Sequence, residues 1–585
     1  MEDAGEHGDE AGDEHAGRQS RRSFLRASGI GAAGIAAGAI GAAAVTRGFQ
    51  GHGDPDATYG FTPLPARREP GFDHVVVLMF ENRSFDHVLG RLYTADSVPN
   101  GQTFEGLQNG DHSNAAPDGT VVPAHVYEGT TDQIMSQPDP DPGEFYSHVN
   151  TQLFDVVDPD TNADLAAHDL AAPWNAPRDK REATMSGFVR DYIINFRLER
   201  GKDPTPEEYA AVMGGFAPEM LPVISALARG FAVYDHWHCA VPSQTFCNRS
   251  FFHASTSHGF VTNVHNGGQS KWLDAPAVPT IFNRLEDAGK IWRVYYDADQ
   301  GASLTGMLHA PSIEKYWKTN FRSMEQFHDD ARTGHLPDYA FIEPRMVFDH
   351  NDMHPPVSRP KVVHESDGAT YDSALSDIRA AEALLAEVYS SVRGASTSDG
   401  SNAMNTMLLV TFDEHGGIYD HVAPPAATPP TKPAEPGEMG FTFDRLGARV
   451  PAIVISAHTA AGTVINDEMH HGSVVKTLCE QHGLSPLTRR DADAPSMRNA
   501  VTLKTPRQPA LWPDVHSPYV PKNPEARRAK PTDAAHRDRP LTAPALGLIG
   551  LLLEKYEPGA ELPRTYGDAY AVLQKHGQDL FGVRD

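Results

Sequence analysis

Six short apolar runs spread along the chain most constrain its fold. They are HVVVLMF (74–80), FAVYD (231–235), IWRVYY (291–296), YAFIE (339–343), MLLVTF (407–412) and VPAIVIS (450–456). Each run is continuous rather than alternating, which is typical of strands covered on both faces of a sheet. Helical patterns lie between them, at 219–231, 278–289 and 373–392. Strands that alternate with helices predict an α/β fold, with a central, largely parallel sheet and helices on both faces.

Two regions outside this pattern predict surface structure. Residues 94–145 are rich in Gly, Pro, Asn and Asp, a composition typical of loops. Residues 504–542 hold many Pro and Arg residues and are expected to wrap the outside of the domain. A final helical stretch follows, from about Ala543 to Phe581.

The N-terminus predicts an export signal. Arg21 and Arg22 precede an uncharged run from Ala27 to Val45 that is mostly Gly and Ala, the pattern of a twin-arginine leader. An uncleaved membrane anchor is the alternative, because a run of this length could cross a bilayer, but Gly and Ala are weakly apolar. We expect cleavage near Ala44 after transport by the twin-arginine machinery. The mature protein is then extracellular, periplasmic or attached to the cell envelope.

The net charge excludes one class of partner. The chain carries 77 acidic and 50 basic residues, a formal charge of −27. Residues 1–44 contain seven acidic and four basic groups, so the mature chain keeps 70 and 46, or −24. Proteins that bind nucleic acid need clustered Lys and Arg to displace counterions from phosphates. We therefore expect no nucleic-acid partner.

Three cysteines, Cys239, Cys247 and Cys479, are too few for a disulfide framework. Cys239 and Cys247 are near enough in sequence to pair after export. Buried, unpaired thiols are the equally open alternative.

Acidic residues gather where the predicted strands end. Ligands of parallel α/β sheets collect at the carboxyl ends of strands. Glu81 and Asn82 follow the first strand, and Asp413 and Glu414 follow the fifth; the second runs into Asp235 and His236, and the fourth ends on Glu343. Three carboxylates and an amide oxygen are ligands that hard divalent cations prefer. Acids that cap helix starts are the alternative for any one of them, but their joint placement favours one divalent metal ion, whose identity oxygen ligands alone do not define.

The stretch VPSQTFCNRSFFHASTSHG, residues 241–259, predicts a turn followed by a helix. Thr245 is then at or near a helix N-terminus, where free amide groups can hold a phosphate. A hydroxyl beside a metal can also be deprotonated into a nucleophile. The plainer interpretation is that Thr245 or Ser243 only caps the helix.

Several of the 29 histidines lie in strongly patterned surroundings. His148 and His354 are in predicted loops, where they could protonate a leaving group or bind a phosphoryl oxygen. His415 and His421 belong to DEHGGIYDH, and His471 precedes a helix whose predicted N-cap is Ser473.

Five blocks in order along the chain resemble one known family. They are HVVVLMFENRSFDH, YDHWHCAVPSQTFCNRSFFHAST, FIEP with NDMHPP, LLVTFDEHGGIYDHVAPP and HHGSVVKTLCEQHGL, from about residue 72 to 485. The family is the bacterial phosphoesterases, which include phosphatidylcholine-type phospholipases C and acid phosphatases and belong to the alkaline-phosphatase-like superfamily. The resemblance implies that fold and one catalytic divalent metal bound by Glu81, Asn82, Asp413, Glu414 and Thr245. It also implies Thr245 as nucleophile, His148 and His354 around the phosphoryl group, and substrate contacts from Asn248, Arg249 and His415.

One departure from the family pattern affects the turn before the nucleophile. The family turn resembles G-P-T-x-P-N-R, whereas this chain has SQTFCNR. Ser243, Gln244 and Cys247 thus replace a Gly and two prolines, while Thr245, Asn248 and Arg249 remain.

These observations predict an exported, metal-dependent phosphoesterase that resembles phospholipase C. Residues 1–44 form the signal peptide, 45–503 the phosphoesterase catalytic domain, and 504–585 a C-terminal segment of the same domain. The substrate is a phosphate ester, with phospholipids among the candidates, although a long amphipathic helix for a membrane surface is lacking. The alternatives are an acid phosphatase acting on phosphomonoesters, and a secreted binding protein that keeps the metal but has lost turnover.

Overall fold

The computed structural model describes residues 61–583, with gaps at 62, 167–168, 180, 265–267, 348–349, 357, 362–369, 374–375, 518–536 and 578. The chain divides into two units, Met1–Ala57 and Thr58–Asp585, and every described residue belongs to the second. The predicted signal peptide, residues 1–44, and residues 518–536 of the predicted wrapping segment lie outside the described residues. Within the described part, no helix is long and apolar enough to cross a membrane.

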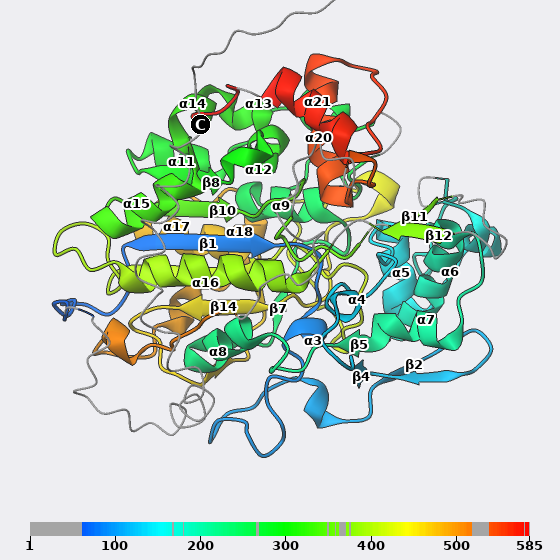
Figure 1. Ribbon diagram of the computed structural model, residues 1–585, viewed down its shortest axis with the longest axis horizontal. Helices are drawn as coiled ribbons and strands as arrows, with labels where there is room; N and C mark the ends of the chain where they lie inside the picture. The colour runs from blue at the N-terminus through cyan, green and yellow to red at the C-terminus, as the bar shows by residue number, and fades with distance from the viewer. Residues whose placement is uncertain are drawn as a thin grey trace, which may run out of the picture. The chain divides into compact units, whose positions relative to one another are not determined.

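An eight-stranded sheet forms the centre of this unit (Figure 1), and it contains all six predicted strands. Its order is β15 (Thr463–Ile465), β6 (Ala232–Tyr234), β14 (Ala452–Ile455), β13 (Thr406–Phe412), β1 (His74–Phe80), β10 (Tyr339–Glu343), β8 (Trp292–Tyr296) and β9 (Phe321–Ser323). Only β14 is antiparallel to its neighbours, and all other pairs in this sheet are parallel. The predicted α/β fold with a largely parallel sheet is therefore confirmed.

The register of β1 and β13 places their carboxyl ends at the same level. Phe80 pairs with Phe412, so both strands leave the sheet together. The side chains of β1 from Val75 to Phe80 are fully buried, because helices cover both faces of the sheet. The residues after these two strands therefore meet at one edge.

Helices lie on both faces of the sheet. α16 (Ile378–Gly394) contacts α8 (Pro222–Gly230) and α15 (Met324–Thr333) on one face, and in Figure 1 it runs alongside β1, between β1 and β14. On the other face, α9 (Thr245–Ala254) contacts α11 (Ile281–Asp287) and α17 (Gly472–His482). The predicted helical stretches 219–231, 278–289 and 373–392 correspond to α8, α11 and α16.

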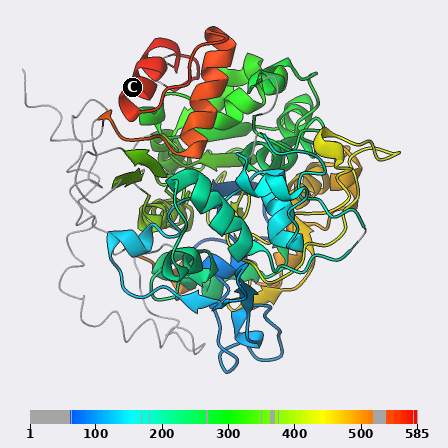
Figure 2. The same cartoon turned by 90° about the vertical axis from the view of Figure 1, so that its right-hand side faces the viewer.

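A separate helical layer lies beyond the carboxyl end of β1, at the right of Figure 1 and facing the viewer in Figure 2. It contains α5 (Tyr146–Phe154) and α6 (Phe188–Arg200), which contact each other and bury their own apolar cluster. The chain reaches this layer through 94–145, which holds only short elements: β2 (Ser113–Ala115), β3 (Val121–Pro123), β4 (His125–Val126) and α4 (Asp132–Met135). This agrees with the predicted loop.

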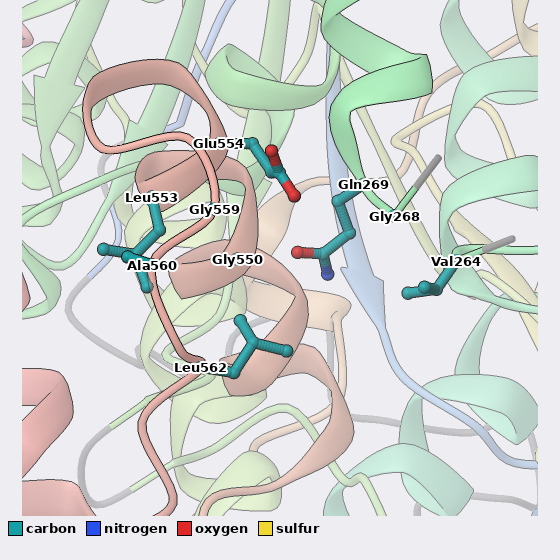
Figure 3. Close-up of a pocket in the computed structure, with 9 residues that line it drawn as sticks. All are labelled: Val264, Gly268, Gln269, Gly550, Leu553, Glu554, Gly559, Ala560 and Leu562. Atoms are coloured by element: carbon teal, nitrogen blue, oxygen red, sulfur yellow. The ribbon is translucent and has the colours of Figure 1, made fainter. Parts of the chain in front are cut away.

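The C-terminal helices pack onto the same unit. α20 (Ala543–Tyr556) contacts α10 (Ser270–Asp274) and α12 (Leu304–Leu308), and α21 (Tyr566–Val572) follows it. The α20 backbone passes so close to Gln269 that a Cβ on Gly550 would lie 1.4 Å from the Gln269 amide oxygen. A cavity of about 70 Å³ lies at this junction, with the Gln269 and Glu554 side chains at its rim (Figure 3). None of the predicted site residues lines it.

Candidate active site

The residues that come directly after β1 and β13 form a buried acidic cluster. Glu81, Asn82, Asp413 and Glu414 are all fully buried. The backbone N–H groups of Asn82 and Glu414 donate to Asp413 Oδ1 at 3.1 and 2.7 Å, which ties the two strand ends together. Gly416 makes the close approach possible, because a Cβ there would lie 2.2 Å from the Asn82 carbonyl oxygen and its φ is +64°. Four residues predicted to bind the metal thus lie side by side.

Thr245 comes to this cluster from a distant part of the chain, at the start of α9. It is the first residue of α9, and Gln244 is the N-cap. Neither Thr245 nor Ser243 is therefore the cap, and the Ser243 hydroxyl donates to the Val261 carbonyl instead. Thr245 Oγ1 donates to Glu81 Oε2 at 3.2 Å. The helix start predicted from the sequence places the hydroxyl against a predicted metal ligand.

The unusual turn before Thr245 is held by side-chain amides. The Gln244 amide oxygen accepts from Asn263 N at 3.0 Å, and the Asn263 amide oxygen accepts from Phe246 N at 2.9 Å. Asn248 accepts from Val241 N at 3.0 Å and donates to the carbonyls of Val241, Ser243 and Gln244. Its predicted contact with substrate stays a prediction, and the described contacts of its side chain all hold the turn.

Arg249 supplies a positive charge to the cluster. Its guanidinium contacts Glu81 Oε1 at 2.5 Å and Asp413 Oδ2 at 3.4 Å, and it is buried with them. Burial acts to lower the pKa of Arg249, but the charges of Glu81 and Asp413 outweigh it and hold the pKa above its ordinary value. Arg249 Nη1 makes no hydrogen bond within the described structure. One guanidinium thus contacts two of the three buried carboxylates of the cluster.

Unsatisfied oxygens in the cluster fit a metal ion. Asn82 Oδ1, Asp413 Oδ2 and Glu414 Oε1 are buried and make no hydrogen bond with any described residue. Burial and the neighbouring acids raise the pKa of both Glu81 and Glu414 well above the ordinary value. Buried acceptors without partners are rare in folded proteins, and a hard divalent cation takes such oxygen ligands. The donor set therefore fits the predicted cation.

A chain of polar side chains supports the cluster from the α5 and α6 layer. His415 Nε2 donates to Gln152 Oε1 at 2.9 Å, since the Gln152 amide nitrogen donates to Gly143 O and Asp191. Burial lowers the pKa of His415 to about 3, so the ring is neutral, and its Nδ1 lies 3.4 Å from Glu414 Oε2. His415 is thus oriented toward the acidic cluster.

His148 is at the far end of this chain. Its Nδ1 is 2.8 Å from Asp191 Oδ1. Burial acts to lower the pKa of His148, and the charge and hydrogen bond of Asp191 overcome it and raise the pKa. The described contacts of its ring are with Asp191 and Phe145. The predicted role of His148 at the phosphoryl group stays a prediction.

His354 reaches the cluster with two acids that sequence reasoning missed. Its Nε2 is 3.5 Å from Glu144 Oε1 and 3.8 Å from Asp141 Oδ2. The Asn82 amide nitrogen donates to Glu144 Oε1. Glu144 and Asp141 belong to the loop before α5, which carries no strand-end pattern. The density of acids in DPDPGE was the available signal.

Two other strand-end acids do not join the cluster. Asp235 accepts from Glu105 N and from the Asn466 amide nitrogen at 2.8 and 2.7 Å. Glu343 accepts from Leu304 N and Thr305 N at 2.7 and 2.9 Å, which caps α12. Both carboxylates hold the fold together.

The remaining polar residues after β1 fasten the two loops of the cluster. Ser84 caps α3 (Phe85–Val88). Arg449, just before β14, contacts Asp86 at 2.9 Å and Asp420 at 2.8 Å. His421 Nδ1 lies 2.6 Å from Asp86 Oδ2. Because β14 is antiparallel, its first residues lie beside the end of β13, and Arg449 can bridge both loops.

His471 holds the loop after β13 in place. Its Nδ1 accepts from Trp237 Nε1 at 3.3 Å, so its Nε2 carries the proton and donates to the Asp413 carbonyl at 2.6 Å. Burial lowers its pKa to about 4. His471 itself is the N-cap of α17, so the predicted N-cap Ser473 is wrong: Ser473 lies inside the helix, where its hydroxyl accepts from His470 N.

All three cysteines are buried free thiols. The structure thus favours the unpaired alternative for Cys239 and Cys247.

The fold and the site together define a class of protein: an α/β protein with a threonine hydroxyl at a helix start beside a buried acidic cluster. Residues 72–485 match the model of a family described as the Phosphoesterase family. The chain belongs to this family, whose members are hydrolases of phosphate esters.

Its relatives carry consistent names. Non-specific phospholipase C6 of Arabidopsis thaliana is 31% identical over 75% of this chain and 75% of its own length. Phospholipase C A of Mycobacterium tuberculosis is 24% identical over 77% of this chain and 81% of its own. Among solved structures, a Vibrio parahaemolyticus protein of the alkaline phosphatase superfamily aligns over 48% of this chain and 65% of its own at 11% identity. Its TM-score of 0.27 is too low to add to the argument.

Proposed function

We propose that this chain is an exported, metal-dependent phosphoesterase of the phospholipase C kind that works through Thr245. One observation carries the proposal. The Thr245 hydroxyl lies at the start of α9, 3.2 Å from Glu81, beside three buried oxygens that make no hydrogen bond with a described residue. A nucleophile, a cation site and a guanidinium are thus brought together from three separate parts of the chain.

The residues that would hold the metal are Glu81, Asn82, Asp413, Glu414 and Thr245. When bound, a divalent cation lowers the pKa of a neighbouring hydroxyl and polarises a phosphoryl oxygen. Oxygen ligands of this kind suit Mg²⁺, Ca²⁺ or Mn²⁺.

The chain's own groups then carry the reaction. Thr245 Oγ1 attacks phosphorus as its proton passes to Glu81 Oε2, and the alcohol leaves as an alkoxide with the electron pair of the broken P–O bond. The alkoxide takes a proton from water. The hydroxide that remains attacks the phosphothreonine, and Thr245 leaves phosphorus and regains its proton from Glu81. Arg249 Nη1, which has no described hydrogen-bond partner, is available to a phosphoryl oxygen, and planar guanidinium groups suit that role.

The names of the relatives favour a phospholipid over a phosphomonoester as the substrate. Purified protein is expected to release phosphocholine from a choline phospholipid faster than it releases phosphate from p-nitrophenyl phosphate. The reverse order would favour the acid phosphatase alternative.

Replacement of the nucleophile tests the reaction. Thr245→Ala is expected to lower kcat by at least about 10³-fold, since loss of a catalytic nucleophile typically costs this much or more. Thr245→Ser keeps the hydroxyl and is the matched control, expected to retain measurable turnover. Both variants are expected to bind the metal. Full activity in Thr245→Ala would exclude this nucleophile.

A further inference from the structure

A second group of acidic and histidine side chains lies beside the proposed site. It consists of Asp141, Glu144 and His354, here termed the Asp141 cluster, and one ligand atom from each lies within 4.8 Å of the others. His354 Nε2 is 3.5 Å from Glu144 Oε1 and 3.8 Å from Asp141 Oδ2. Ligand atoms of a tetrahedral site with bonds of about 2.1 Å are about 3.4 Å apart. The cluster therefore has nearly the spacing that a bound cation requires.

The tautomer of His354 leaves the lone pair of its Nε2 facing Glu144 and Asp141. His354 Nδ1 lies 2.6 Å from the Pro355 carbonyl oxygen, which can only accept, so Nδ1 carries the proton. His354 is fully buried, and its Nε2 makes no hydrogen bond within the described structure. A histidine that donates one N–H to a backbone carbonyl presents its other nitrogen in the usual way of a metal ligand.

Neither carboxylate of the cluster forms an ion pair with a Lys or Arg side chain among the described residues. Asp141 Oδ1 is buried and makes no hydrogen bond with a described residue. Arg83 is nearby, but the described hydrogen bonds of its guanidinium go to the carbonyls of Met353 and Gln137. The buried carboxylate of Glu144 and the partly buried carboxylate of Asp141 repel one another unless a proton or a metal ion lies between them.

We propose that Asp141, Glu144 and His354 bind a second divalent cation of the zinc type. A ligand set of one imidazole nitrogen and two carboxylates suits Zn²⁺, whereas the all-oxygen set around Asp413 suits harder cations. His354 is then a ligand rather than a proton donor. None of these three residues belongs to the first site, so the inference does not rest on the proposed function.

Asn82 connects the two sites. Its amide nitrogen donates to Glu144, while its amide oxygen is one of the unsatisfied oxygens of the first site. A cation at the Asp141 cluster would therefore orient a ligand of the other site through Glu144.

The test counts zinc ions in the full-length protein. Metal-free protein is titrated with Zn²⁺, desalted and analysed for metal per chain, and the zinc environment is examined by X-ray absorption. Glu144→Gln keeps an acceptor for Asn82 but loses the charge. His354→Asn keeps a donor for Pro355 but removes the Nε2 ligand. Glu382→Gln, which changes a buried carboxylate of α16 far along the chain, is the matched control.

Wild type and Glu382→Gln are expected to bind zinc at the Asp141 cluster, with an imidazole nitrogen in the spectrum. Glu144→Gln and His354→Asn are expected to bind one zinc ion per chain fewer than wild type, because their zinc affinity at the Asp141 cluster falls at least about 100-fold. Thermal melts followed by circular dichroism establish that each variant is folded. If either variant is not folded, Asp141→Asn, which removes the third ligand, is used in its place.

The inference is overturned if both variants bind as much zinc as wild type, or if no imidazole nitrogen is found. One further variant, Glu414→Gln, distinguishes zinc bound at the Asp141 cluster from zinc bound at the first site. If Glu414→Gln binds as much zinc as wild type and Glu144→Gln binds one ion fewer, the zinc lies in the Asp141 cluster and not in the first site.

Discussion

Arg249 has a role that depends on whether the acidic cluster holds metal. It is buried with Glu81 and Asp413 and contacts both. Replacing one partner of a buried ion pair leaves an uncompensated charge, which typically costs about 3–5 kcal/mol. A divalent cation would compensate that charge in its place.

We therefore expect Arg249→Met to lower the free energy of unfolding by about 3–5 kcal/mol in metal-free protein, and by clearly less when the divalent metal is present. Urea unfolding with and without chelator measures both values. Arg490→Met is the control, because the buried Arg490 guanidinium donates only to backbone carbonyls in its described hydrogen bonds. An equal loss for Arg249→Met under both conditions would contradict a metal in this cluster.

Single residues also show that contacts between distant segments cannot be predicted from local sequence. Glu81 and Glu343 both follow or end a buried strand, yet Glu81 meets Thr245 and Glu343 caps α12. The difference lies in which distant segment packs against each strand end, and local sequence does not contain it. Glu144 was missed for the same reason: its contact with Asn82 joins residues 62 positions apart through a loop.

At the scale of elements, α16 and α8 are joined by a buried carboxylate. Glu382 of α16 accepts from Val223 N and Ile224 N, the free amides at the start of α8, at 2.7 and 2.9 Å. Burial raises its pKa from 4.5 to about 7, more than these hydrogen bonds lower it. A raised carboxyl pKa stabilises the fold below pH 4.5, and that contribution is lost as the pH rises through about 7.

The difference in unfolding free energy between wild type and Glu382→Gln is therefore expected to change as the pH rises from below 4.5 to above 7. Wild type should lose about 3 kcal/mol relative to the variant over this range, the value that the pKa shift implies. Denaturant unfolding at several pH values measures it. A difference that is constant with pH would show that Glu382 titrates normally.

The helices and strands that could be predicted are those with a clear hydrophobic pattern in their sequence. Continuous apolar runs identified β1, β6, β8, β10, β13 and β14, because strands buried on both faces need such runs. The short strands β9 and β15 lie at the two edges of the sheet, where mixed sequences such as Phe321–Ser323 are tolerated. The antiparallel direction of β14 was not foreseen, since an apolar run carries no information on strand direction.

At the scale of the whole molecule, transport is a separate proposal from catalysis. We propose that Arg21 and Arg22 direct export of the chain by the twin-arginine route. Replacing both with Lys is expected to keep the protein inside the cell, and N-terminal sequencing of exported wild type should begin near Val45 after cleavage near Ala44. Export of the double variant at the wild-type level would contradict this route.

The proposed reaction is a double displacement at phosphorus through Thr245, and its stereochemistry distinguishes it from direct attack by water. A phosphorothioate substrate of known configuration is hydrolysed in ¹⁸O-labelled water, and the configuration of the product is determined. Two successive in-line displacements, first by Thr245 and then by water, predict overall retention of configuration at phosphorus. Inversion would mean that water attacks phosphorus directly, and it would contradict the account.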